Sequence, residues 1–354
     1  MNYNKLDQQG FSLIELMIGT LIGLILSLAI MEIYLSQSQL YKASNSQALI
    51  QSTENAISNL VTPVIRSAGF TGCSTIATAI SNLNAGGPRP IGIMNTTPTM
   101  IMGYNGGTSS MTLTANPTNS GSASDWSPAL DATLVGSVEK GSDVLVVLGS
   151  AVGGYPLGLT AVDLDSSSLT IQSAEGTNIT AGQFAAVSDC VKTAIFQITG
   201  VTGTNISHNA GSGILQNANS EFPVSFQVGS QFVLLQQTAF FVGQGQGGQS
   251  ALMRATLVGN NWSVQPIVPG VALMKVQYGI GTNGIITQYI AANAVPNWAQ
   301  VYAVRIGFII EGQPGSGTPN TTQFTVMDIP VTVPADNRLR HVYEITINLR
   351  NALS

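Results

Sequence analysis

The sequence predicts an α+β protein in which one long N-terminal helix packs on a mostly antiparallel β head. Residues 10–31 are apolar over a length that can cross a membrane as a helix, and residues 32–65 keep apolar side chains at helical spacing. From Cys73 onward, short apolar runs are separated by clusters of Gly, Asn and Pro. No amphipathic helices lie between these runs, which favours antiparallel sheets over a parallel α/β fold.

The N-terminal apolar run contains one carboxylate, Glu15. A charge at the centre of a membrane helix costs about 2.5–3.5 kcal/mol on insertion scales, so Glu15 needs a partner. No Lys or Arg lies between Phe11 and Lys42. The simplest candidate partner is therefore an α-amine, which becomes available if the chain is cut just before Phe11.

The ten residues before the apolar run form a short polar leader, Met1–Gly10, that ends in a small residue. A secretory signal peptide is cleaved after its apolar region, whereas a cut here would leave the apolar helix attached to the mature chain. The leader balances Lys5 against Asp7. Because acidic residues count little in the positive-inside rule, Lys5 and the N-terminal amine still orient the leader towards the cytoplasm.

The motif Gly10-Phe-Ser-Leu-Ile-Glu15 resembles the class III signal of type IV prepilins and pseudopilins. The resemblance implies that a prepilin peptidase cleaves between Gly10 and Phe11 and methylates the new N-terminal Phe11. It also implies that Glu15 pairs with the terminal amine of a neighbouring subunit during assembly. The alternative is an ordinary N-terminal anchor in which Glu15 reaches the lipid headgroups.

Composition favours an exported protein and argues against nucleic-acid binding. Charged residues make up 8% of the 354 residues, well below the roughly 25% of ordinary soluble proteins, and 38 Gly with many Ser, Thr, Asn and Gln provide the polar surface. The net charge is −5, and the twelve Lys and Arg are scattered rather than clustered as a nucleic-acid surface requires. No second membrane-length apolar run follows Met31.

The chain has two cysteines, Cys73 and Cys190, which lie 117 positions apart. With one membrane anchor and the rest of the chain outside the cytoplasm, an oxidising periplasm is the expected compartment. We therefore expect a disulfide, which would contribute about 4.7 kcal/mol for a loop of this size in the chain-entropy model. The alternative is a pair of buried free thiols.

The predicted helix continues from the membrane to about Thr62. Ile50, Ile57 and Val64 recur every seven residues, and further apolar side chains fill the same side: Ala43, Ala56, Leu60 and Val61. Pro63 and Gly69 mark its expected end. We expect residues 1–10 to be a cleaved leader, 11–32 a transmembrane half, 33–70 a periplasmic amphipathic half and 71–354 a β-rich globular head.

Five apolar runs are the clearest strand candidates: residues 144–148, 232–242, 271–278, 301–310 and 343–349. In the last of these runs, apolar and polar side chains alternate strictly. Residues 81–130 are rich in Asn, Thr, Ser, Gly and Pro, which predicts long loops with few strands.

Further segments resemble the landmarks of PilW-type minor pilins, which are similar in fold to the J-type minor pseudopilins of type II secretion. In chain order they are residues 66–73, 141–145, 187–190, 269–278 and 338–350. They span most of the chain and include both cysteines. The resemblance implies a place at the pilus tip in a priming complex with PilV-, PilX- and FimU-type minor pilins, the major pilin and a large tip adhesin.

No motif in the sequence supports an enzyme, a cofactor or a metal site. His208 and His341 lack metal-binding spacing, and we expect His341 to be a solvent-facing strand residue. Residues 243–248 fit the spacing Gly-x-Gly-x-x-Gly, but another apparent strand follows instead of a helix, which predicts a hairpin loop. Asp163 and Asp165 could ligate calcium, although two loop carboxylates are more often simply solvated.

The leading hypothesis is a non-enzymatic minor pilin, processed by prepilin peptidase, that takes part in priming or tip assembly of a type IV pilus and so in twitching motility. It would sit in the inner membrane as a single-pass protein with its head in the periplasm and then join the pilus at the cell surface. One alternative is a minor pseudopilin of a type II secretion system. Another is a pilus-borne adhesion module that uses the loops of residues 81–130 and 201–220.

Overall fold

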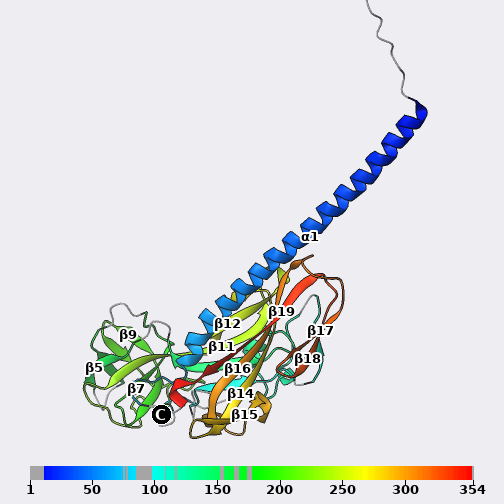
Figure 1. Cartoon of the computed structure of the whole chain (residues 1–354). Helices are drawn as coiled ribbons and strands as arrows, with labels where there is room; N and C mark the ends of the chain where they lie inside the picture. Colours follow the sequence, from blue (N-terminus) through cyan, green and yellow to red (C-terminus); the bar gives the residue numbers. More distant parts are fainter. Residues whose placement is uncertain are drawn as a thin grey trace, which may run out of the picture.

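The computed structural model consists of one long helix that leads into a β head with two lobes (Figure 1). It describes residues 12–74, 76, 79–84, 98–107, 109–115, 118–151, 155–162, 167–173 and 178–352. We call the described part of residues 155–232 the small lobe, because it has a hydrophobic core of its own, and the rest of the head the main lobe. The observed class is the predicted one: a long N-terminal helix followed by a mostly antiparallel head.

Helix α1 spans Leu13–Arg66, a few residues more than the sequence predicts. Pro63 lies inside the last turns instead of ending the helix, and Gly69 follows the end with a φ of +74°. The helix continues past Pro63 because Val61 and Ile65 are buried against the head, and this packing outweighs the cost of the lost backbone donor.

The C-terminal half of α1 contacts the head through one stripe, in which every third or fourth residue is buried: Ser46, Ile50, Thr53, Ile57, Val61 and Ile65. This stripe packs mainly on β16 (Val301–Pro314) and β19 (Arg338–Asn348). Polar contacts fix its position along the helix axis. The Ser46 hydroxyl accepts a hydrogen bond from the Gln313 amide at 3.2 Å, and Glu54 Oε1 lies 2.7 Å from His341 Nδ1.

The largest sheet in the described part of the chain is built round β11 (Gln231–Gln244). Along one path its order is β1-β8-β7-β11-β5-β6-β10-β9, while β4 and β2, and β12 and β13, branch from β11. The other members are β1 (Ala79–Ser81), β2 (Ile101–Tyr104), β4 (Val144–Ser150), β5 (Leu157–Val162), β6 (Ser168–Ile171), β7 (Phe184–Ser188), β8 (Thr193–Gln197), β9 (Gly200–Thr202), β10 (Asn205–Ser207), β12 (Ser250–Val258) and β13 (Asn261–Pro269). Strand β11 therefore belongs to both lobes.

A second sheet has the order β15-β14-β16-β19, with β14 at Val271–Thr282 and β15 at Ile285–Ala291. Strand β16 is buried on both faces. Ile306 and Phe308 belong to the main core, and Ile309 lies in a smaller cluster under the third sheet. That sheet has the order β17-β18-β3, formed by β17 (Thr322–Val326), β18 (Ile329–Val333) and β3 (Met111–Thr112).

Two of the described strand pairs are parallel, β1 with β8 and β3 with β18, and the other pairs are antiparallel. Each parallel pair is short and joins a strand of residues 79–112 to a strand that lies much later in the sequence. The remaining elements are α2 (Ala132–Val135) and the short 3₁₀ turns η2 (Ala123–Asp125), η3 (Gln246–Gly248), η4 (Ala292–Ala294), η5 (Trp298–Gln300) and η6 (Arg350–Ala352).

Candidate assembly site

The N-terminus of α1 forms a capping box from Ser12 and Glu15. The Ser12 hydroxyl accepts a hydrogen bond from the Ile14 amide at 3.2 Å, and Glu15 Oε2 accepts one from the Ser12 amide at 3.1 Å. Ser and Glu at this spacing satisfy helix N–H groups that otherwise lack partners. Glu15 thus has a partner within its own helix, which the sequence reasoning did not foresee. Gly10 and Phe11 lie outside the described residues.

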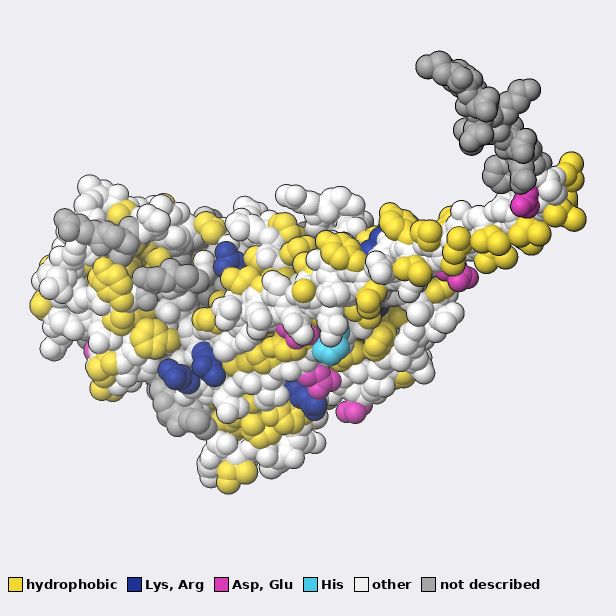
Figure 2. Space-filling view, turned by 45° about the horizontal axis from the view of Figure 1, so that its top comes forward, with side chains coloured by type: hydrophobic (Ala, Val, Ile, Leu, Met, Phe, Trp, Pro, Cys, Tyr) yellow, Lys and Arg dark blue, Asp and Glu magenta, His cyan; other side chains and the backbone are white. Residues whose placement is uncertain are grey.

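The N-terminal half of α1 projects from the head and is surrounded by uncovered apolar side chains (Figure 2). More than half of the surface is exposed on Leu13, Ile25 and Ile30, for example, and the exposed apolar residues continue to Leu40 and Tyr41. Within the part of the chain that the structure describes, α1 is the one helix long and apolar enough to cross a membrane. An apolar surface of this extent requires lipid or other apolar helices around it.

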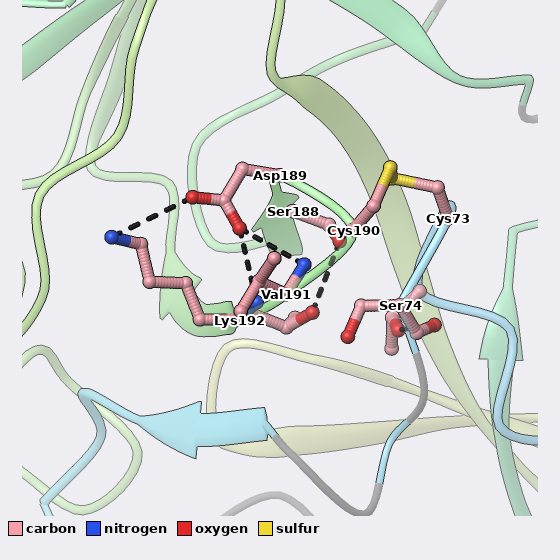
Figure 3. The surroundings of a disulfide bond; sticks show 9 residues. Cys73, Ser74, Ser188, Asp189, Cys190, Val191 and Lys192 are labelled. Carbon is pink, nitrogen blue, oxygen red and sulfur yellow. Dashed lines mark hydrogen bonds and ion pairs between the residues drawn. A yellow bond between two sulfur atoms is a disulfide. The ribbon is translucent and has the colours of Figure 1, made fainter.

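Cys73 and Cys190 are joined by a disulfide, with a Cα–Cα distance of 4.6 Å (Figure 3). Cys73 lies just after α1, and Cys190 lies in the turn between β7 and β8 of the small lobe. In that turn, the Asp189 carboxylate accepts hydrogen bonds from the Val191 and Lys192 amides at 3.1 and 3.0 Å. The bridge therefore attaches the small lobe to the segment that leaves the helix.

Two of the remaining motifs of the sequence, His341 and residues 243–248, lie where the sequence predicts. His341 is 59% exposed on β19, as predicted. Residues 243–248 form the tip of the β11–β12 hairpin, and β12 follows instead of a helix. Among the described residues, no group of three or more His, Cys, Asp or Glu side chains is placed to hold a metal ion. Asp163 and Asp165 lie outside the described residues.

The main core contains an ion pair that the sequence did not predict. Lys275 Nζ lies 3.0 Å from Asp143 Oδ1 and donates to the Gly107 carbonyl at 2.7 Å, and both charged side chains are almost fully buried. Asp143 Oδ2 also accepts from the Val276 amide at 2.9 Å. Burial raises the pKa of Asp143, while Lys275 lowers it. The pair joins β14 to the residue just before β4.

Two further buried groups have shifted pKa values. Burial raises the pKa of Glu139 to about 7, and the negative charge of the nearby Glu311 also raises it. A hydrogen bond with the Ser250 hydroxyl lowers this pKa and so opposes the shift. Burial lowers the pKa of His208 to about 4. The His208 ring stacks on Phe222 with centroids 4.2 Å apart, inside the small lobe. Burial of these groups depends on distant parts of the chain, so no local sequence signal could have revealed it.

Comparison with protein families places known motifs at both ends of the chain. Residues 239–351, which run from β11 to η6, match the model of the family described as type IV pilus-assembly protein W. Residues 5–31 match the prokaryotic N-terminal methylation motif, which covers the leader and the projecting half of α1.

Comparison with individual proteins adds little. One solved structure, a type IV-like pilin TTHA1219 from Thermus thermophilus, is similar at 18% identity and a TM-score of 0.23, over 50% of this chain and 87% of its own. No curated protein matches the sequence.

Proposed function

We propose that the chain is a PilW-type minor pilin that takes part in priming or tip assembly of a type IV pilus, as the matches to the PilW family model and to the methylation motif support. The proposed partners are PilV-, PilX- and FimU-type minor pilins, the major pilin, a tip adhesin and the prepilin peptidase. The observation that carries the proposal is an uncovered apolar helix with one acid, Glu15, near its free end. The pilin family supports a structural, non-enzymatic role.

The projecting half of α1 supports storage in the membrane before assembly. Residues 13–31 are apolar over a length sufficient to cross a bilayer, and none of the most apolar stretch is buried by the head. Extraction from lipid would expose this surface to water, so the helix must be covered by neighbouring helices at once. The methylation motif and this helix fit a membrane-anchored pilin, and we propose that the head lies in the periplasm before it joins the pilus.

Glu15 supports a specific register between neighbours. In the single chain its carboxylate accepts a hydrogen bond from the neutral Ser12 amide. Cleavage between Gly10 and Phe11 would create a charged α-amine on every subunit, and a charged donor binds a carboxylate more strongly than an amide does. We propose that Glu15 exchanges its own cap for the terminal amine of an adjacent subunit, because an unpaired carboxylate in an apolar helix bundle is costly.

The proposed processing predicts the covalent state of the mature protein. Mass spectrometry of the subunit purified from membranes should find a chain that begins at Phe11 with a methylated amine. The same sample, digested without reduction, should yield a peptide pair linked through Cys73 and Cys190. A chain that begins at Met1 would contradict the processing, and two alkylatable thiols in freshly isolated protein would contradict the disulfide.

A deletion strain tests the proposed role in the pilus. We expect loss of the gene to abolish or strongly reduce surface pili and twitching, with protein secretion unchanged, and expression of the intact chain from a plasmid should restore both. Normal piliation with lost secretion would instead identify a minor pseudopilin of a type II system. Normal pili with lost surface attachment would favour the adhesion module.

A further inference from the structure

A cavity of about 240 Å³ lies in the main lobe, where β3, the turn before β4, β12, β14, β16 and β19 meet. We call it the Glu139 pocket. The residues that line it include Thr114, Thr118, Glu139, Ser250, Leu273 and Arg340. None of its described lining residues is aromatic, so a ligand there would be recognised by polar contacts and not by ring stacking.

Of the four charged residues that line the pocket, all but Glu139 lie within ion-pair distance of an opposite charge. Glu311 lies 2.9 Å from Arg340 and 3.8 Å from Arg338, and Asp336 lies 2.6 Å from Arg340. Lys140 lies 3.1 Å from Asp125. Through these contacts, each of the other charged lining residues has an oppositely charged partner: Lys140, Glu311 and Arg340.

Glu139 makes no ion pair with any residue that the structure describes. When it is ionised, its side chain is the one charge of the pocket lining without an opposite charge within ion-pair distance.

Two buried polar atoms of the lining residues have no hydrogen-bond partner among the described residues. One is the acceptor Oε1 of Glu139, a residue that is only 4% exposed, and the other is the donor Nε of Arg340. Buried polar groups in folded proteins almost always have a partner, either from the protein or from a molecule bound to it. The pocket therefore lacks one donor, at Glu139, and one acceptor, at Arg340.

We propose that the Glu139 pocket binds a small hydroxylated amine, such as an amino sugar, with its ammonium group on Glu139. An ammonium group beside Glu139 would favour the ionised carboxylate and would match its single charge, whereas a divalent cation would leave an excess charge of the opposite sign. The hydroxyls of Thr114 and Thr118 can both donate to and accept from ligand hydroxyls, and the Ser250 hydroxyl, which donates to Glu139, can still accept. A ligand hydroxyl would also provide the acceptor that Arg340 Nε lacks.

The proposal goes beyond the assembly role and does not depend on it. Titration calorimetry of the full chain in detergent micelles, with glucosamine and glucose as probes, tests it. The two sugars share a ring and differ in the ammonium group. We expect glucosamine to bind about tenfold or more tightly than glucose, because the charge-assisted hydrogen bond to Glu139 is available only to the amine.

Two variants separate the carboxylate from the shape of the pocket. Glu139→Gln should reduce glucosamine binding to the level of glucose, and Thr118→Phe should weaken it by obstructing the pocket while Glu139 stays in place. Glu221→Gln removes an exposed acid in the small lobe and should change nothing. The proposal is overturned if neither sugar binds, if the two bind equally, or if Glu139→Gln binds glucosamine as the wild type does.

Discussion

Glu15→Ala should nearly abolish incorporation of the subunit into pili while it leaves the subunit in the membrane. The variant helix is more apolar than the wild type, so its insertion into lipid is not impaired. In the assembled bundle, however, the terminal amine of the neighbour would lose its carboxylate. Breaking a buried ion pair by removing one partner costs about 3–5 kcal/mol, which lowers the association constant roughly a hundredfold or more. Immunoblots of sheared pili and of membranes measure both pools.

Two matched variants control for changes elsewhere in the helix. Glu32→Ala removes an exposed acid of the same helix, just beyond the apolar run, and should assemble normally. Ser12→Ala removes the hydroxyl cap at a cost of about 1 kcal/mol but keeps Glu15, so its defect should be much smaller. Undiminished incorporation of Glu15→Ala would leave the assembly mechanism without support, and an equal defect in Glu32→Ala would assign the effect to helix charge in general.

The second large effect concerns the pH dependence of stability, in which two buried groups should oppose each other. The folded state holds the proton of Glu139 up to about pH 7, whereas the unfolded chain loses it near 4.5. Between these values the folded state binds more protons, so its stability falls as pH rises, by about 3 kcal/mol in total. The unfolded chain binds a proton on His208 below about 6.5, whereas the folded state does so only near 4. The contribution of His208 to the free energy of unfolding therefore rises with pH by a similar amount.

In the wild type, the loss of stability with pH from Glu139 and the gain from His208 should nearly cancel between about pH 4.5 and 6.5. Glu139→Gln should then gain stability relative to the wild type as pH rises through this interval, and His208→Phe should lose stability relative to it. Denaturant unfolding of the full chain in micelles at pH 4.5, 5.5 and 6.5 measures the differences, and the double variant should again follow the wild type. If the free energy of unfolding changes with pH in the same way for all four proteins, neither Glu139 nor His208 has the shifted pKa.

The helix was predictable from the sequence because its pattern is local. Its burial was predictable only in part, since Leu60 was expected on the packed side and is 41% exposed. Val64 packs against the main core as expected but is only partly buried, and near the end of α1 Ile65 is the fully buried residue.

The strands followed from alternating and apolar runs, but their pairing did not. The apolar run 232–242 identified β11, yet nothing in it shows that β11 pairs with strands of both lobes. The ion pair between Lys275 and Asp143 joins residues 132 positions apart. Glu139 likewise acquires its surroundings from β12 and β16. Such sites depend on tertiary contacts, and a single sequence contains no local signal for them.

The packing of α1 on β16 and β19 has a consequence for biogenesis. The ribosome makes the helix long before β19, because α1 spans Leu13–Arg66 and β19 begins at Arg338. The membrane anchor can thus be inserted long before the surface that receives Ile57 and Val61 exists. Until β19 has been made, the buried stripe in the C-terminal half of α1 lacks part of its docking surface, and a chain that stops before β19 would keep that stripe exposed to quality-control proteases.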